Sequence, residues 1–239
     1  MSVINIKKGL DLPISGKPST TVDDEKTPRS VAVLGADYPG MKPTMLVQAG
    51  DTVNKGQALF SDKKNEGVLF TSPSSGVVSG INRGEKRTLL SVTIDRTDGS
   101  EEEFGQYEAG QLDALDRAVI QEQLVKSGQW TAFRTRPYSK IPAINSVPNS
   151  IFVTAMNTDP LSGEPTIIVK RSQEEFDAGI FVLTRLTEGT VYICVEDNSD
   201  ISTRYSDIET VAVLLLKRTQ DGQLTPWVQD ENFAIPLST

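Results

Sequence analysis

The sequence predicts a mixed α+β fold, in which an all-β module comes first and a partial α/β domain follows. From Val31 to about Ile94, short runs rich in β-branched and aromatic residues alternate with Gly, Pro, Asp and Asn, without a helical period sustained over three turns. After this stretch, a strand-like, a helix-like and a second strand-like segment follow in order. That order is typical of a parallel α/β unit.

Residues 1–30 are expected to form an N-terminal arm. Several prolines and glycines interrupt this stretch, so we expect an extended path with one strand at Val3–Ile6. Gly9, Pro13 and Gly16 set the course of the arm, either toward a neighbouring subunit or as an ordinary strand and turn. Both alternatives remain open.

Residues 31–100 are expected to form a compact β module. Its strands are expected at residues 31–34, 44–47, 58–60, 68–71, 77–81 and 89–94. Tight turns are expected at Gly50-Asp51 and Lys55-Gly56, with an exposed hairpin at Asp62–Gly67. The boundary to the next domain is placed in or just after the acidic turn near residues 96–106.

Residues 107–209 are expected to form the α/β domain, and residues 210–239 a separate C-terminal segment. The expected elements of the domain are a helix over residues 112–124, a strand at 151–156, a helix from Ser172 that Gly189 closes, and a strand at 191–195. Ser172 and Glu175 have the spacing of a capping box. The C-terminal segment is expected to hold a strand, a turn at Gln220-Asp-Gly and an irregular end.

Charge and hydropathy exclude several classes of partner. The chain has 32 Asp plus Glu against 24 Lys plus Arg, a formal charge of −8, so nucleic acid is not an expected partner. The longest apolar run, Val211–Leu216, is about a third of a membrane-spanning helix. The opening residues lack the pattern of a signal peptide. We therefore expect a cytoplasmic chain without a membrane span of its own.

The scarcity of cysteine and histidine limits the chemistry of the chain. Cys194 is the only cysteine and there is no histidine, so neither an internal disulfide nor a four-cysteine metal site can form. No catalytic, cofactor-binding or metal-ligating residue is assigned. Cys194 lies in an apolar strand and is expected to be an inert thiol. Asp197 and Asp200 do not have calcium-loop spacing and are expected in a solvated loop.

Residues 46–64 and 71–81 resemble the barrel-sandwich fold of biotinyl and lipoyl carrier domains. In lipoyl domains, an Asp-Lys pair at a hairpin tip carries the cofactor, and Asp62-Lys63 occupies that place here. Lys63 is then either a modified carrier lysine or an ordinary solvated lysine of a scaffold. Lys64 and Asn65 follow it, where carrier tips are usually acidic and apolar, which favours the scaffold.

The wider sequence resembles the A subunit of the sodium-translocating NADH:quinone oxidoreductase. The matching segments, in the same order as in that family, are residues 7–18, 40–45, 82–87, 127–143 and 152–161. The most specific of them contains Trp130-Thr-Ala-Phe-Arg-Thr-Arg-Pro-Tyr138. The resemblance covers roughly residues 4–195.

This resemblance implies a peripheral cytoplasmic subunit on the inner membrane of a bacterium. The family is related to a subunit of the Rnf complex and lacks the usual flavin-binding and cluster-ligating motifs. The whole complex oxidises NADH, reduces ubiquinone and exports sodium, with flavins and ion path in other subunits. The A subunit is associated with the quinone-reducing end, so ubiquinone is implied as a substrate of the complex and no cofactor is implied for this chain alone.

The sequence departs from the family after Tyr192–Glu196. Family members run on for about as many residues again and include a His-Pro-Ala-Gly segment, which this chain lacks. Three hypotheses follow: a quinone-proximal subunit of a sodium pump, a carrier domain modified on Lys63, or an interaction module derived from a truncated subunit.

One proline-interrupted segment mixes aromatic and basic residues and is the candidate contact with a partner or with quinone. Its members are Trp130, Phe133, Arg134, Arg136, Tyr138 and Lys140. This mixture suits burial of aromatic rings against a partner, while the basic groups meet carboxylates or lipid phosphates. Alternatively, the rings pack inward and the arginines pair with acids of the chain. A smaller basic cluster of Arg83, Lys86 and Arg87 is expected to be a solvated turn.

Overall fold

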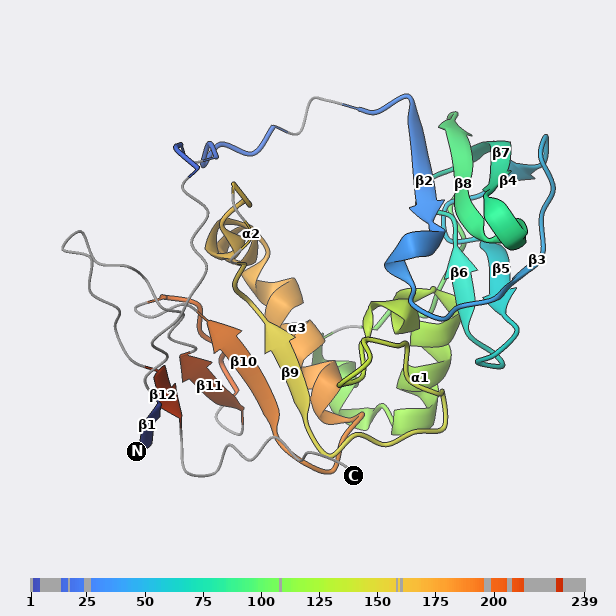
Figure 1. Ribbon diagram of the computed structural model, residues 1–239. Helices are drawn as coiled ribbons and strands as arrows, with labels where there is room; N and C mark the ends of the chain where they lie inside the picture. The colour runs from blue at the N-terminus through green and yellow to red at the C-terminus, as the bar shows by residue number, and fades with distance from the viewer. Residues whose placement is uncertain are drawn as a thin grey trace. The chain divides into compact units, whose positions relative to one another are not determined.

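The computed structural model describes most of the chain (Figure 1). The described residues are 2–4, 14–16, 18–23, 27–107, 109–157, 159, 161–195, 199–205, 208–212 and 227–229. They form two compact units, one of residues 23–147 and the other of residues 1–22 together with 148–239. The mixed α+β architecture expected from the sequence is confirmed.

The unit of residues 23–147 contains two antiparallel sheets. One has the order β2 (Ser30–Leu34), β8 (Leu89–Arg96), β7 (Gly76–Arg83) and β4 (Thr52–Val53); the other has the order β3 (Pro43–Met45), β5 (Ala58–Asp62) and β6 (Leu69–Thr71). The six expected strands are all present, and only the short β4 was not expected. A 3₁₀ turn, η1 (Gly35–Asp37), follows β2, and another, η2 (Glu85–Arg87), joins β7 to β8.

The core of this unit draws on both sheets. Leu59 and Phe60 are neighbours on β5, yet both are fully buried, because the pairing with β6 shifts register between Ala58 and Phe60. The Phe60 ring stacks on Phe70 with centroids 4.5 Å apart. Further fully buried side chains are Val53, Val68, Val78, Val92 and Ile94. Burial of these apolar side chains is the main force that holds the sheets together.

Two tight turns lie where the sequence placed them. Gly50 and Gly56 have φ of +97° and +88°, values that favour glycine. At the first turn, the Asp51 carboxylate accepts a hydrogen bond of 2.7 Å from the Gln48 amide. The hairpin at residues 62–67 is also present, between β5 and β6.

The helix expected over residues 112–124 begins later. Residues Ala109–Ala114 form the 3₁₀ turn η3, and α1 spans Arg117–Lys126. The start is set by Asp116, whose carboxylate accepts a hydrogen bond of 2.9 Å from the Val119 amide and so caps the helix. A last 3₁₀ turn, η4 (Gln129–Ala132), follows α1.

The other unit is built around a parallel sheet. The strands β9 (Ile151–Thr154), β10 (Val191–Val195) and β11 (Glu209–Ala212) are ordered β11-β10-β9, and α2 (Pro165–Arg171) and α3 (Gln173–Thr184) connect β9 to β10. Ile180 on α3 packs in one cluster with Ile193 and Val195 on β10. The parallel α/β arrangement expected from the sequence is therefore confirmed. A separate antiparallel pair joins β1 (Ser2–Ile4) to β12 (Trp227–Gln229).

The second helix begins where the sequence placed it, because α3 starts at Gln173 with Ser172 as its N-cap residue, but the expected side-chain cap and the expected end were wrong. The Ser172 side chain makes no capping hydrogen bond, because Ser172 also ends α2, where its amide donates to the carbonyls of Ile168 and Val169. The helix ends at Thr184 rather than near Gly189. Gly189 is needed for a close approach instead, since a Cβ there would lie 1.7 Å from the Asn149 carbonyl oxygen.

Some expected features lie outside the described residues, and others stay predictions. Gly9, Pro13, Asp197 and the turn at residues 220–222 are not among the described residues. Residues 107–147 belong to the same compact unit as the β module. The expected limits of the arm, the β module, the α/β domain and the C-terminal segment stay a prediction. In the described part of the chain, no helix is both long and apolar enough to cross a membrane.

A methyl group at position 76 should strain the β7–β8 pair. A Cβ at Gly76 would lie 2.2 Å from the Asp95 carbonyl oxygen, so we expect Gly76→Ala to lower the free energy of unfolding by about 1–3 kcal/mol, measured by urea denaturation. Gly110→Ala is the control, because no atom lies within 4 Å of a Cβ there. Equal stability of the two variants would contradict this packing.

Candidate functional site

Trp130, the first aromatic residue of the candidate segment, packs inward on η4. Its exposed fraction is 4%, and its indole Nε1 donates a hydrogen bond of 3.0 Å to the Pro142 carbonyl. The ring meets Phe133 edge to face, with centroids 5.2 Å apart. This pair therefore forms the inner side of the segment.

Arg134 ties the segment to the connection between β2 and β3. Its Nη1 donates to the carbonyls of Thr131 and Phe133, and its Nη2 donates to the Asp37 carbonyl at 3.2 Å. The guanidinium carbon lies 5.3 Å from the centroid of the Tyr38 ring. Arg134 thus bonds backbone carbonyls and an aromatic face, where the sequence had suggested acidic side chains as the alternative partners.

The remaining candidates lie on a tight turn. The Thr135 amide and hydroxyl both donate to the Lys140 carbonyl, at 2.8 and 3.0 Å. The turn exposes Arg136, Tyr138 and Lys140, and Tyr138 is 74% exposed. The Lys140 ammonium lies 5.7 Å from the Tyr138 ring centroid. The six candidate residues therefore lie close together in the chain but divide into two groups. The anchored group is Trp130, Phe133 and Arg134, and the exposed group is Arg136, Tyr138 and Lys140.

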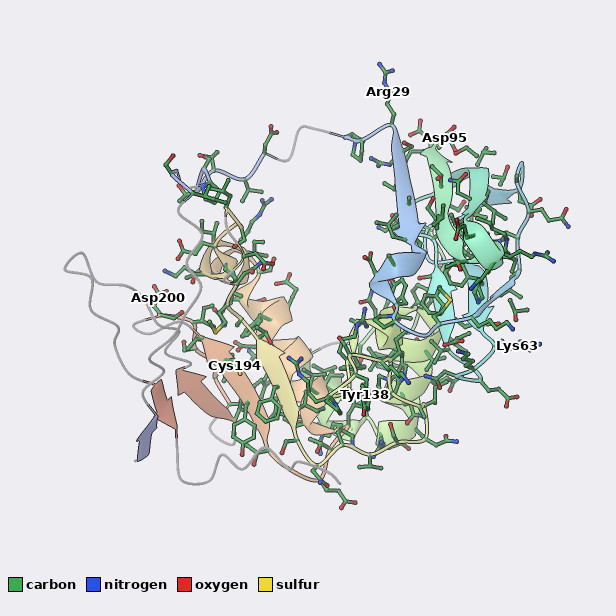
Figure 2. The ribbon with its side chains drawn as sticks, viewed as in Figure 1. Arg29, Lys63, Asp95, Tyr138, Cys194 and Asp200 are labelled. Carbon is green, nitrogen blue, oxygen red and sulfur yellow. The ribbon has the colours of Figure 1, made fainter. Side chains whose placement is uncertain are left out.

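The hairpin tip, residues 62–67, is held on one side by its own aspartate. Asp62 is only 7% exposed, and its Oδ1 accepts hydrogen bonds from the amides of Lys42 (3.0 Å) and Lys64 (2.9 Å). The Lys63 amide donates to the Lys42 carbonyl at 2.8 Å. The Lys63 side chain is exposed, as Figure 2 shows, but its backbone is fixed.

The other side of the hairpin tip is held by the candidate segment. The Asn65 amide nitrogen donates to the carbonyls of Ile141 (3.2 Å) and Pro142 (3.0 Å), and a Cβ at Gly67 would lie 2.8 Å from the Ile144 side chain. We call this set of contacts between residues 62–67 and 141–144 the hairpin clamp. The sequence contained no signal for it, because its partners are more than seventy residues apart.

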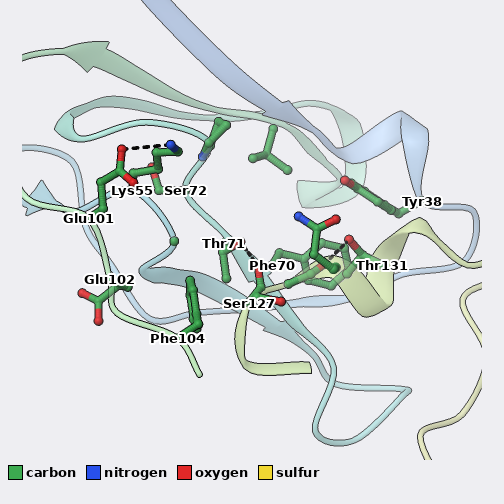
Figure 3. Close-up of a pocket in the computed structure, with 15 residues that line it drawn as sticks. Tyr38, Lys55, Phe70, Thr71, Ser72, Glu101, Glu102, Phe104, Ser127 and Thr131 are labelled. Atoms are coloured by element: carbon green, nitrogen blue, oxygen red, sulfur yellow. Dashed lines mark hydrogen bonds and ion pairs between the residues drawn. The ribbon is translucent and has the colours of Figure 1, made fainter. Parts of the chain in front are cut away.

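A cavity of about 520 Å³ lies beside the anchored group (Figure 3). Its walls come from the β module, from the acidic segment around Glu101 and from the junction of α1 with η4. The lining residues include the aromatic rings of Tyr38, Phe70 and Phe104. The junction fits closely: the Thr71 hydroxyl donates to the Ser127 carbonyl at 3.0 Å, and a Cβ at Gly128 would lie 2.4 Å from that hydroxyl oxygen.

The charged groups at the cavity are paired. The Lys55 ammonium lies 2.9 Å from the Glu101 carboxylate, and Asn54 donates to Glu102 at 3.1 Å. No pair of a nucleophile and a base is found among the residues that line the cavity. The lining thus combines aromatic rings with charged groups that are already engaged in contacts within the chain.

The other residues considered from the sequence lie on other segments of the chain. Burial raises the pKa of the Cys194 thiol on β10, which lowers its thiolate fraction and agrees with an inert role. Asp200 forms an ion pair with Lys170, and the hydrogen bond from Lys170 lowers the pKa of Asp200. At the β7–β8 turn, Arg83 donates to the Arg87 carbonyl at 3.1 Å.

Comparison with family models gives two matches, one after the other. Residues 4–97 match the NqrA N-terminal barrel-sandwich hybrid domain, and residues 115–216 match the NqrA second alpha/beta domain. The first match agrees with the carrier-like β module expected from the sequence. The second continues past Glu196, where the resemblance had been expected to end.

Curated relatives match most of this chain but less than half of their own length. The chain is 53% identical over 207 residues to the A subunit of the Na(+)-translocating NADH-quinone reductase of Vibrio parahaemolyticus, which covers 87% of this chain and 46% of that protein. The protein of the same name from Alcanivorax borkumensis is 52% identical over 200 residues, and that from Saccharophagus degradans is 50% identical over 201. These matches cover 83% and 84% of this chain and 45% of each relative. The chain thus spans about half the length of the curated relatives it matches.

Removal of the Asn65 side chain should release the hairpin clamp. We expect Asn65→Ala to lower the free energy of unfolding by about 1–2 kcal/mol, because two carbonyls lose a partner, and to speed tryptic cleavage after Lys63 and Lys64. Urea denaturation and timed proteolysis measure the two effects. Asn145→Ala, at an exposed position of the same segment, is the control and should change neither. Unchanged cleavage in Asn65→Ala would show that the clamp does not hold the tip.

Proposed function

The chain belongs to the NqrA family, of which it carries the N-terminal barrel-sandwich hybrid domain and the second α/β domain, and we propose that it works as the A subunit of a sodium-translocating NADH:quinone reductase. The observation that carries this proposal is the identity of about half of all residues over 87% of the chain. Identity at this level, spread across both units, supports a shared role as well as a shared fold.

The proposed role is that of a peripheral subunit near the site of quinone reduction. The complex couples NADH oxidation and ubiquinone reduction to sodium export, while this chain contributes surfaces and binds neither NADH nor flavin. Support comes from the candidate segment, in which an exposed aromatic and basic turn lies next to anchored residues that reach the aromatic cavity wall through Arg134 and Tyr38. Ubiquinone is the proposed substrate of the complex.

The proposed partners are the other subunits of the membrane-embedded complex, on the cytoplasmic side of a bacterial inner membrane. The turn at residues 135–140 is the proposed contact. Tyrosine and arginine are the residues that most often dominate binding energy at protein interfaces, and Arg136 and Tyr138 are both exposed here.

A carrier function is not favoured. Lys63 is followed by Lys64 and Asn65, where carrier tips are usually acidic and apolar, and the Asn65 side chain is engaged in the hairpin clamp. The family match points the same way, since it assigns the β module to the NqrA N-terminal domain. Lys63 is therefore interpreted as a surface residue of a scaffold.

Co-purification tests the proposed role. When the tagged chain is expressed together with the membrane subunits of the reductase, we expect it to recover them from detergent-solubilised membranes. The double variant Arg136→Glu/Tyr138→Ala should reduce recovery by about tenfold or more, because it removes two exposed anchors.

Arg29→Glu/Tyr107→Ala is the matched control, since both side chains are exposed in the same unit but lie outside the turn. It should recover the membrane subunits as the unchanged chain does. A tagged chain that stays free of membrane subunits would count against the proposed role in the reductase and leave an isolated interaction module as the better account.

A further inference from the structure

Five exposed basic residues come together around the turn at residues 135–140. They are Lys42, Lys63, Lys64, Arg136 and Lys140, and we call them the basic face. Three separate segments contribute them: the residue before β3, the hairpin tip and the candidate segment. The set therefore exists only in the folded unit.

Backbone contacts show that these segments are neighbours. The amides of Lys42 and Lys64 bind the same Asp62 oxygen, and Lys63 donates to the Lys42 carbonyl. On the other side, a Cβ at Gly40 would lie 3.7 Å from the Lys140 side chain. The hairpin clamp completes the ring by joining Asn65 to the carbonyls after Lys140.

The basic face has a local charge opposite to that of the whole chain. Residues 38–46, 60–67 and 130–144 hold six Lys or Arg against Asp62 and Glu66, which gives +4, whereas the whole chain carries −8. The Asp62 carboxylate is turned inward to backbone amides. Among the described residues, no ion pair joins any member of the basic face to a carboxylate. An anionic surface would therefore attract these cations, and it would repel the rest of the chain because that part is negatively charged.

We propose that the four lysines of the basic face bind directly to a lipid bilayer surface that carries anionic headgroups, beside the Arg136 and Tyr138 side chains that the proposed function assigns to the contact with the membrane subunits. This goes beyond the proposed function, because it gives the chain a membrane contact that no other subunit needs to supply. Tyr138, beside Lys140 on the turn, is 74% exposed, and tyrosine is enriched at the level of lipid headgroups. Lys63 and Tyr138 lie toward the end of the unit away from Arg29 and Asp95 (Figure 2).

The composition of the face favours lipid over an acidic protein. Four of the five cations are lysines, which act as flexible point charges, while recognition of single carboxylates at protein interfaces more often uses the rigid fork of arginine. A layer of headgroups presents spread negative charge without fixed positions, and each lysine or arginine near such a layer contributes about 1 kcal/mol.

Vesicle sedimentation tests this inference with the chain alone. At about 100 mM salt, we expect the chain to sediment with vesicles of phosphatidylcholine that contain phosphatidylglycerol, to remain in solution with pure phosphatidylcholine, and to be released by about 500 mM salt. Lys63→Glu/Lys64→Glu/Lys140→Glu should lower the partition coefficient by about 100-fold or more, from three contributions of this size.

The control is Arg29→Glu/Lys86→Glu/Arg87→Glu, which changes the net charge equally at exposed positions outside the basic face. It should keep most of the binding, and circular dichroism checks that both triple variants are folded. Equal binding to neutral and anionic vesicles, or an equal loss in the control, would overturn the proposal. So would binding only to detergent-solubilised membrane subunits, which would identify an acidic protein surface as the partner. Because no other subunit is present with the vesicles, their result is independent of the co-purification result.

Discussion

The carbonyl of Pro142 accepts hydrogen bonds of 3.0 Å from both the Trp130 indole and the Asn65 amide, and the arrangement of the candidate site depends on this shared acceptor. Trp130 comes from the turn after α1, and Asn65 comes from the hairpin tip of the β module. The carbonyl therefore joins two parts of the unit that are far apart in the chain.

The hairpin clamp distinguishes this β module from carrier domains of similar fold. In a carrier domain the hairpin tip presents a modified lysine. Here the Asp62 carboxylate accepts from the amides of Lys42 and Lys64. The Asn65 side chain donates to the carbonyls of Ile141 and Pro142, so the tip becomes a fixed support for residues 141–144. The carrier-like module then serves as a rigid support for surfaces that face outward. This agrees with membership of the NqrA family.

Much of the fold could be predicted because its signals are local. The β module and the parallel α/β unit follow from alternation, turn residues and element order, and their strands lie within a few residues of the expected positions. The helix ends could not be predicted as well, since they depend on which polar group accepts a hydrogen bond from a free backbone amide. Asp116 starts α1 in this way, whereas Ser172 ends α2 instead of capping α3 with its side chain.

The candidate site could be found from the sequence only in outline. The mixture of aromatic and basic residues at 130–140 marked the segment, but composition could not tell that Trp130 and Arg134 are anchored while Tyr138 is exposed. The basic face was hidden for a different reason. Its residues are spread over about a hundred positions, and the net charge of −8 masks a local excess of positive charge.

Amide hydrogen exchange of the unmodified chain tests the central claim, that the hairpin tip and residues 141–144 form one rigid support. The account predicts slow exchange at the amides of Lys42, Lys63 and Lys64, which are all hydrogen-bonded, at rates similar to one another. Fast exchange at Lys63 and Lys64, while the amides of β7 and β8 stay protected, would show a free arm on a folded module and would contradict the account.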